Sequence, residues 1–309
     1  MKYELTIFIT TFERPKYLEE CLNNLSNQSY QKFKVIILDN SENINYLNLL
    51  NQNFTFDIKY KKNKRNIGSV KNLFQAFSWN MDTEYFMIFH DDDLMHKNYL
   101  ELSMKILKEN QKIAWVGCNL SKNNLDHDKK IKLNFKLYNK HELINNILSG
   151  INFTYSSIIY NKKNINLLNL DDYLKKYSII HDRPLIINFI KKNNLAAIIN
   201  NKLVYYRIHD EQDSKTGSLN ISIDNQFNLY KFYKDNLDKN IITFFRYNIF
   251  VCNNIIGDFF NLNNQDKISL IDYLRKAKKE NVINYSFPIF YLVSKIYFLI
   301  KKIIYKIID

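Results

Sequence analysis

Three consecutive carboxylates stand near the end of the first third of the chain. The segment Phe89-His90-Asp91-Asp92-Asp93-Leu94 places them directly after the apolar residues 85–89. Adjacent carboxylates repel one another at pH 7, and a divalent cation accommodates them most easily. A hard ion such as Mg²⁺ or Mn²⁺ is usually held by one or two carboxylates and by the oxygens of a diphosphate. The run therefore predicts a metal–diphosphate site; a solvated acidic turn that caps the next helix is the alternative.

Two further segments of the first half place polar residues where ligands bind. Asp39 ends the apolar run 33–38 and is followed by Asn40-Ser41, so it either accepts hydrogen bonds from a base or ribose or caps a helix. The stretch Asn66-Ile67-Gly68-Ser69-Val70-Lys71-Asn72 opens a predicted helix. Backbone N–H groups and the dipole at a helix N-terminus favour an anion, and an ordinary turn is the alternative.

Two segments of the second half are candidates for catalysis and for binding. His181-Asp182-Arg183-Pro184 precedes a predicted helix over residues 185–190. Asp182 either caps that helix or acts as a general base, which requires a carboxylate within hydrogen-bond reach of a substrate hydroxyl. Tyr205-Tyr206-Arg207-Ile208-His209-Asp210 ends an apolar strand in two groups suited to phosphate or metal, although a single histidine at a strand end is more often structural.

Strands and helices alternate around these residues. Apolar runs predict strands at residues 5–10, 33–38, around 58, 85–89 and 113–117, and helical spacing predicts helices from 15, across 70–77 and over 98–109. This alternation indicates a mostly parallel sheet covered by helices on both faces. Thr10, Thr11, Asp39 and the acidic run then lie at the carboxyl ends of strands, the edge where open α/β sheets bind ligands.

The second half of the chain is less diagnostic. Residues 119–140 are polar and lysine-rich and are predicted to form loops, 153–160 and 195–207 to form strands, and residues from 219 onward to form helices. The tail from 285 to 309 is strongly apolar, but Lys295 interrupts it before the roughly 18 apolar residues of a membrane span are reached. Lys295, Lys302 and Lys306 fall within about 40° on a helical wheel. This pattern fits a helix lying in a membrane surface or a core helix with a solvated lysine stripe.

Composition excludes several classes of protein. The 309 residues carry a formal net charge of +13 and include only 5 Gly, 3 Pro and 3 Cys. So few Gly and Pro exclude collagen-like and low-complexity chains, and three widely spaced Cys exclude a zinc ribbon and favour a reducing compartment. The first residues lack the apolar core and cleavage site of a signal peptide. The charge alone would suit a nucleic-acid-binding module, but no binding motif is recognisable and the acidic run would repel phosphate in the absence of a metal.

In this order, the segments resemble those of the inverting glycosyltransferases of family two, which have the GT-A fold. Ile7-Phe8-Ile9-Thr10-Thr11-Phe12-Glu13-Arg14-Pro15 resembles the family's first strand and its Pro-Thr-Tyr-Asn-Arg turn, and Val35-Ile36-Ile37-Leu38-Asp39-Asn40-Ser41 resembles the strand that ends in a base-contacting aspartate. Asn66-Ile67-Gly68 is similar to its Asn-x-Gly segment, Asp91-Asp92-Asp93 to its D-x-D, and Arg207-x-His209 to its later Arg-x-His element. Thr10, Asn40 and His181 depart from the family's usual Pro, acidic residue and Glu.

The resemblance implies a role for each matching residue. Asp182 would be the catalytic base, and Asp91, Asp93 and His209 would hold Mn²⁺ or Mg²⁺ on the diphosphate. The nucleotide-sugar would be bound by Thr10, Thr11, Glu13, Asp39, Arg65, Asn66, Gly68, Lys71, Asp92 and Arg207. The implied architecture is a GT-A domain over residues 1–218, with a nucleotide-sugar half (1–118) and an acceptor half (119–218), followed by a helical extension over 219–309.

The function that the resemblance implies is a metal-dependent, inverting transfer of a hexose, with UDP-glucose or UDP-galactose favoured as donor. The charge and the tail favour a saccharide acceptor linked to a polyprenyl diphosphate, used in bacterial surface-polysaccharide assembly such as O-antigen, lipopolysaccharide or capsule. The expected location is cytoplasmic and peripheral, at the anionic inner face of the inner membrane. A catalytically silent sugar-binding or scaffold protein of the same fold is the main alternative. A sugar-nucleotide pyrophosphorylase is less favoured, since no Gly-rich loop follows the first strand.

Overall fold

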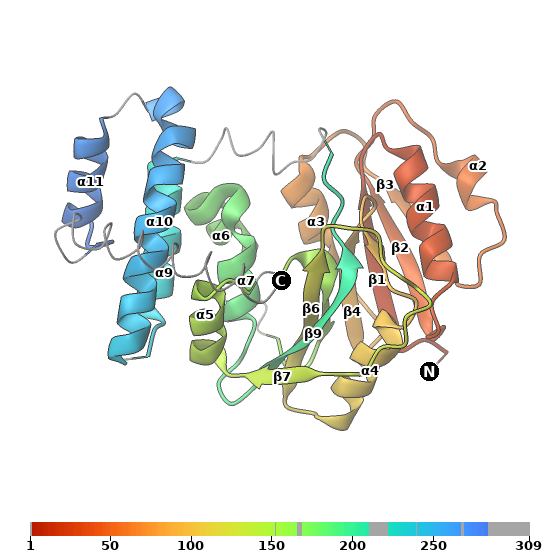
Figure 1. Cartoon of the computed structure of the whole chain (residues 1–309). Helices are drawn as coiled ribbons and strands as arrows, with labels where there is room; N and C mark the ends of the chain where they lie inside the picture. Colours follow the sequence, from red (N-terminus) through yellow and green to blue (C-terminus); the bar gives the residue numbers. More distant parts are fainter. Residues whose placement is uncertain are drawn as a thin grey trace. The chain divides into compact units, whose positions relative to one another are not determined.

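The computed structural model describes residues 2–151, 153–165, 169–209, 222–238, 240–266 and 269–283 (Figure 1). The chain divides into two compact units. Unit 1 comprises Met1–Lys140, Asn152–Leu170 and Leu185–Gln212, and unit 2 comprises His141–Ile151, Asp171–Pro184 and Asp213–Asp309. All the strands named below belong to unit 1, so this unit carries the strand ends that the sequence assigns to ligand binding. The division into domains at residue 218 stays a prediction.

The first half of unit 1 alternates strands and helices as predicted. It contains, in order, β1 (Leu5–Thr11), α1 (Pro15–Ser26), β2 (Phe33–Asp39), α2 (Leu47–Leu50), β3 (Ile58–Lys62), α3 (Ser69–Ser78) and β4 (Tyr85–His90). β1 pairs in parallel with both β2 and β4, and β2 pairs in parallel with β3. The predicted strands and helices of this half are confirmed, and α2 is a single additional turn.

Antiparallel strands join the sheet in its second half. These elements are β5 (Leu94–Met95), α4 (Tyr99–Glu109), β6 (Ile113–Ser121), β7 (Phe135–Tyr138), β8 (Ile158–Asn161) and β9 (Leu195–Tyr205). The described strands are ordered β3-β2-β1-β4-β8-β6-β9-β5, and β7 pairs with β9. β6 and β9 are parallel, β8 is antiparallel to β4 and β6, and β5 and β7 are antiparallel to β9. The predicted α/β class, a mixed sheet flanked by helices, is confirmed.

The sequence misplaced two elements of this second half. Residues 119–140, predicted to form loops, include the end of β6 and all of β7. Among the described strands β7 pairs with β9 alone, and three of its four residues are exposed, so it lacks the buried apolar run that marks a central strand. Residues 153–160 begin with a 3₁₀ turn, η1 (Tyr155–Ser157), and only then enter β8.

Helices cover both faces of the sheet because the central strands are apolar on both sides. Ile7 of β1 shares a buried core with Leu22 of α1. Phe8 faces the other way, since successive side chains of a strand alternate between faces. Its ring meets that of Phe86, which in turn lies 5.8 Å from the ring of Phe77 in α3. α1 and α3 therefore pack on opposite sides of β1 (Figure 1).

Unit 2 is helical where the structure describes it. It contains most of α5 (Lys140–Leu148) and α6 (Leu170–Tyr177), then η2 (Ser178–Ile180), the start of α7 (Asp182–Asn188), α9 (Ile223–Asp235), α10 (Ile241–Asp266) and α11 (Leu270–Lys279). The sequence predicted the last three but not α5 or α6. In the described ranges no helix combines the length and the apolar character needed to cross a membrane. The predicted membrane-surface helix over 285–309 lies outside these ranges.

Glu4, just before β1, gives a stability prediction that depends on pH. Partial burial disfavours its charged form, but hydrogen bonds from Lys108 and Tyr30 lower the pKa of Glu4 from 4.5 to about 2. The stabilisation is therefore fully present above pH 4.5 and is lost as the pH falls toward 2. We expect Glu4→Gln to lower the free energy of unfolding by about 1 kcal/mol at pH 7 and by less at pH 3, as measured by urea denaturation. An equal loss at both pH values would contradict this assignment.

Candidate active site

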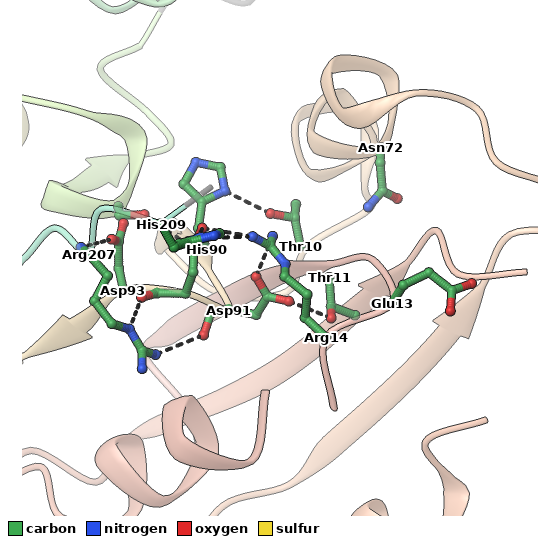
Figure 2. A network of polar contacts seen from close by, with 12 residues as sticks. Thr10, Thr11, Glu13, Arg14, Asn72, His90, Asp91, Asp93, Arg207 and His209 are labelled. Atoms are coloured by element: carbon green, nitrogen blue, oxygen red, sulfur yellow. Dashed lines mark hydrogen bonds and ion pairs between the residues drawn. The ribbon is translucent and has the colours of Figure 1, made fainter. Parts of the chain in front are cut away.

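The carboxyl ends of β1, β2 and β4 bring their polar residues to one edge of the sheet. Thr11 is in register with Asp39 of β2, and Thr10 is in register with His90 of β4. The Thr11 hydroxyl donates a hydrogen bond of 2.6 Å to Oδ2 of Asp91, and Thr10 Oγ1 lies 2.9 Å from Nδ1 of His90 (Figure 2). The predicted gathering of these strand-end residues is confirmed.

Arg14, in the turn between β1 and α1, lies against the acidic residues. Its Nη2 is 2.7 Å from Oδ1 of Asp91, and its Nη1 is 2.8 Å from Oδ2 of Asp92. The Arg14 backbone N–H donates to the hydroxyl of Tyr46 at 3.1 Å, which fixes the turn. The Asp91 side chain is fully buried, and that of Arg14 is 18% exposed. One guanidinium therefore pairs with two neighbouring carboxyl groups, and its contact with Asp91 is drawn in Figure 2.

The end of β9 closes the site from the other side. β5 and β9 are antiparallel with Leu94 opposite Tyr205, which carries the residues after β9 back to the acidic run. The backbone N–H of Arg207 donates to Oδ1 of Asp93 at 3.3 Å. Nε2 of His209 is 2.9 Å from Oδ2 of Asp92. The acidic run and the Arg-x-His segment, far apart in the sequence, thus form one cluster.

The Arg207 guanidinium contacts other groups of the protein. It donates to the backbone carbonyls of Asp91 and Asp92 and to the Glu20 carboxylate of α1. Its Cζ lies 4.5 Å from the centre of the Tyr17 ring, a cation–π contact. Arg207 thus holds the acidic backbone in place from outside. Its predicted contact with the nucleotide-sugar stays a prediction.

Burial and neighbouring charges shift the pKa values of the three carboxyl groups in different directions. Burial, opposed by Arg14, raises the pKa of Asp91 to about 7. Burial and the neighbouring charge of Asp92 raise the pKa of Asp93 to about 8. Burial alone would also raise the pKa of Asp92, but His90, Arg14 and His209 lower it below its usual value. Near pH 7 Asp92 is therefore ionised, whereas Asp91 and Asp93 bind a proton more readily than an ordinary carboxylate, and a bound cation would displace such a proton.

The donor chemistry of this cluster suits a hard divalent cation, because Asp91 and Asp93 offer carboxylate oxygens in a buried setting. The arrangement differs from the predicted one in one respect. His209 contacts Asp92, whereas the sequence groups it with Asp91 and Asp93. Over the described ranges, no three His, Cys, Asp or Glu side chains are placed together to hold a metal ion. The predicted ligand set of Asp91, Asp93 and His209 stays a prediction.

Asp39 is fixed at the end of β2. Its Oδ1 accepts from the backbone N–H of Ser41 at 2.7 Å, and its Oδ2 accepts from the hydroxyl of Tyr60 at 2.6 Å. Glu13, also predicted to bind the nucleotide-sugar, accepts from the backbone N–H groups of Glu42 and Asn43, each at 2.9 Å. Both carboxylates order the rim of the site, and their predicted contacts with the nucleotide-sugar stay predictions.

Asparagine side chains link the end of β2 to the start of α3. Asn40 donates to Oδ1 of Asn66 and accepts from the Ile67 backbone N–H at 3.0 Å. Buried Asn72 of α3 donates to the Leu38 carbonyl at 2.8 Å and accepts from Asn63 at 2.9 Å. These bonds position the Asn-x-Gly segment beside Asp39. Arg65 and Lys71, predicted to contact ribose or phosphate, are exposed on this segment.

Gly68 precedes α3 with φ of 85° and ψ of 152°, a combination that is essentially restricted to glycine. A Cβ atom there would meet nothing within 4 Å, so only backbone strain opposes a side chain. We expect Gly68→Ala to lower the free energy of unfolding by about 1–3 kcal/mol in urea denaturation. Ser69→Ala, at the exposed next position, should change it by less than about 0.5 kcal/mol. Equal stability of the two variants would contradict the strain.

Asp182 is the first residue of α7 and is partly exposed. The helix begins three residues before the predicted 185 and ends at Asn188. His181 is buried, and its Nδ1 lies 2.8 Å from the Ser178 carbonyl. Burial lowers the pKa of His181, so a neutral ring stands beside Asp182 at pH 7. In unit 2 Asp182 also lies near Tyr233, whose pKa is raised to about 12 by burial and by the Asp182 charge.

Sequence reasoning overlooked several residues of the site. Arg14 stands inside the first motif, but its type and position there do not reveal its contact with Asp91. Tyr60 belongs to no motif. Asn72 ends the quoted Asn66–Asn72 segment, but its type and position there do not reveal its hydrogen bonds with the Leu38 carbonyl and Asn63. Phe12 lies 43% exposed between Thr11 and Glu13, and its aromatic type within the first motif is the signal that could have singled it out.

The chain has the GT-A fold, and solved structures of TarS share it. Residues 1–349 of TarS from S. aureus, solved with UDP-GlcNAc, align over 90% of this chain and 80% of that one, with 14% identity and a TM-score of 0.54. TarS solved with UDP gives a TM-score of 0.53 at 13% identity over 89% of this chain and 78% of that one.

Sequence comparison gives the family. The model of glycosyl transferase family 2 matches residues 6–167, and the chain belongs to this family. Abequosyltransferase RfbV of Salmonella typhimurium is 25% identical over 265 residues, 72% of this chain and 79% of the relative. A Methanococcus voltae protein named dolichyl N-acetyl-alpha-D-glucosaminyl phosphate 3-beta-D-2,3-diacetamido-2,3-dideoxy-beta-D-glucuronosyltransferase is 29% identical over 126 residues, 37% of this chain and 38% of the relative. The predicted family, fold and transferase class are confirmed.

Proposed function

We propose that the protein transfers a hexose from a UDP-sugar to a saccharide acceptor with inversion at the anomeric carbon. The observation that carries the proposal is the meeting of Thr11, Asp39 and Asp91 at one edge, with the Thr11 hydroxyl 2.6 Å from Asp91. A nucleotide laid across this edge has its base near Asp39 and its diphosphate near the acidic run. UDP-glucose or UDP-galactose is the favoured donor, and the UDP-GlcNAc complex of TarS supports a uridine nucleotide.

The residues around the diphosphate have separate tasks in this proposal. Asp91 and Asp93, with His209, would hold Mn²⁺ or Mg²⁺, which when bound neutralises charge on the departing UDP. Arg207 keeps the acidic backbone in position through the carbonyls of Asp91 and Asp92. Phe12, with its exposed ring, offers a stacking surface for the base, an interaction worth about 1–3 kcal/mol.

Asp182 is the proposed general base. Its carboxylate removes the proton from an acceptor hydroxyl, and that oxygen attacks the anomeric carbon from the face opposite UDP. The buried, neutral His181 beside it places no positive charge next to the base at pH 7.

A lipid-linked acceptor used in bacterial surface-polysaccharide assembly completes the proposal. The name of the Methanococcus voltae relative specifies a dolichyl-linked sugar phosphate, and that of the Salmonella relative specifies abequose transfer. The net charge of +13 favours the anionic inner face of the bacterial inner membrane as the place of action. Location in the cytoplasm and peripheral attachment are part of the same proposal.

The experiment that tests this function is a UDP-release assay of the purified protein. A panel of UDP-sugars is combined with polyprenyl-diphosphate-linked saccharides, and product is identified by mass spectrometry. We expect acceptor-dependent UDP release with one donor, its loss in EDTA and its recovery on adding Mn²⁺ or Mg²⁺. Full turnover in EDTA would contradict the metal requirement, and binding of UDP-sugar without any transfer would favour the silent sugar-binding alternative.

A further inference from the structure

Arg14 occupies the place in the site where positive charge is needed most. Its guanidinium contacts Oδ1 of Asp91 and Oδ2 of Asp92 at 2.7 and 2.8 Å, and the Asp91 side chain has no exposed surface. A buried carboxylate is costly unless an opposite charge compensates it. The Arg207 guanidinium donates to backbone carbonyls and to Glu20. Arg14 makes the ion pairs with the side chains of Asp91 and Asp92.

A divalent cation bound to Asp91 would compete with Arg14. Mg²⁺ and Mn²⁺ bind carboxylate oxygens at about 2.0–2.2 Å, a position that places them against a guanidinium already 2.7 Å from the same Oδ1. Two positive groups cannot share that oxygen without strong repulsion. In a protein without substrate, Arg14 therefore opposes metal binding at Asp91.

A diphosphate can bind the metal ion and Arg14 at the same time, so the two no longer compete for Asp91. Its oxygens coordinate a metal ion and also accept the paired N–H groups of an arginine. The Arg14 side chain is 18% exposed, while its backbone is fixed to the Tyr46 hydroxyl. The guanidinium can therefore turn from the carboxylates to a phosphate without movement of the turn that carries it.

We infer that Arg14 is a displaceable counter-ion that makes metal binding at Asp91 depend on the diphosphate of the donor. This inference rests on the proposed metal-dependent function. In the free protein Arg14 pairs with Asp91 and Asp92. When the nucleotide diphosphate enters together with the metal, Arg14 moves to a phosphate oxygen and the metal takes its place on Asp91. Arg14 is thus a positioning residue that couples two binding events.

The test is a Mn²⁺ titration of the full chain, followed by the loss of the electron paramagnetic resonance signal of free Mn²⁺, with and without saturating UDP. We expect UDP to strengthen Mn²⁺ binding to the unmodified protein by at least about tenfold, the equivalent of 1.4 kcal/mol. Arg14→Gln should bind Mn²⁺ about tenfold more tightly than the unmodified protein when UDP is absent. Arg14→Lys keeps the positive charge but loses the paired N–H groups of the guanidinium. Its Mn²⁺ affinity without UDP should lie between those of the unmodified protein and Arg14→Gln, and it replaces Arg14→Gln if that variant does not fold.

Arg275→Gln is the matched control, since it removes one positive charge from an exposed α11 side chain that pairs with Asp272. It should bind Mn²⁺ like the unmodified protein. If the Arg14 variants and the unmodified protein bind Mn²⁺ equally well without UDP, the inference is wrong while the metal proposal stands. If none of the proteins binds Mn²⁺ even with UDP present, both the metal proposal and the inference fail.

Discussion

Asp182→Asn is expected to lower kcat by about 10²- to 10⁴-fold, the usual contribution of a general base. The amide has nearly the size of the carboxylate but cannot accept a proton from the acceptor hydroxyl at neutral pH. Since the proposed donor contacts come from the strand ends of unit 1, the Kd for UDP should change by less than about twofold. The measurement combines UDP release with isothermal titration of UDP.

Asp172→Asn is the control for this change. Asp172 is exposed in the first turn of α6, also in unit 2, and its replacement removes the same charge. Its kcat should stay within about twofold of the unmodified value. Normal turnover by Asp182→Asn would remove Asp182 from the mechanism, and an equal loss in both variants would indicate a general effect of charge.

Trp115→Ala is expected to lower the free energy of unfolding by about 3–5 kcal/mol. Trp115 is fully buried in β6, its ring lies 5.4 Å from that of Phe153, and its Nε1 donates to the Ile186 carbonyl of α7 at 3.2 Å. The substitution leaves a large cavity and a carbonyl without its donor. Urea denaturation followed by far-ultraviolet circular dichroism measures the loss.

Trp115→Phe separates packing from the hydrogen bond. It keeps most of the ring volume and removes the indole N–H, so a loss of about 1–2 kcal/mol is expected. If Trp115→Phe costs as much as Trp115→Ala, the hydrogen bond to Ile186 and not the volume of the ring dominates. If neither costs more than about 0.5 kcal/mol, Trp115 is not part of the core that stabilises unit 1.

The first half of the fold is predictable because its signals are local. The run 35–38 is apolar at every position, as expected for a parallel strand buried on both faces. Pro15 opens α1 at a position where proline is favoured. β7 cannot be predicted from an apolar run, because most of its residues are exposed. α5 and α6 are nine and eight residues long, so their periodic signal is weak.

The candidate site is predictable in its members and less so in its contacts. Thr11, Asp39 and the acidic run were placed at one edge because parallel strands share the direction in which they end. The contact of Arg14 with Asp91 and that of His209 with Asp92 depend on the register of the strands and on the reach of long side chains. Neither is encoded in the type or spacing of these residues, so only the three-dimensional structure shows them.

The strand β9 determines when the site can be completed during folding. The hydrogen bond from Arg207 to Asp93 joins residues 114 positions apart, and β6 and β9 are parallel neighbours separated by a long crossover. Contacts of such long range form slowly because the intervening chain must first lose much of its conformational entropy. The strands β1 to β4, by contrast, are close in sequence and can pair while the ribosome is still adding residues. A nascent chain that ends before residue 195 therefore carries three aspartates without the segment that closes over them.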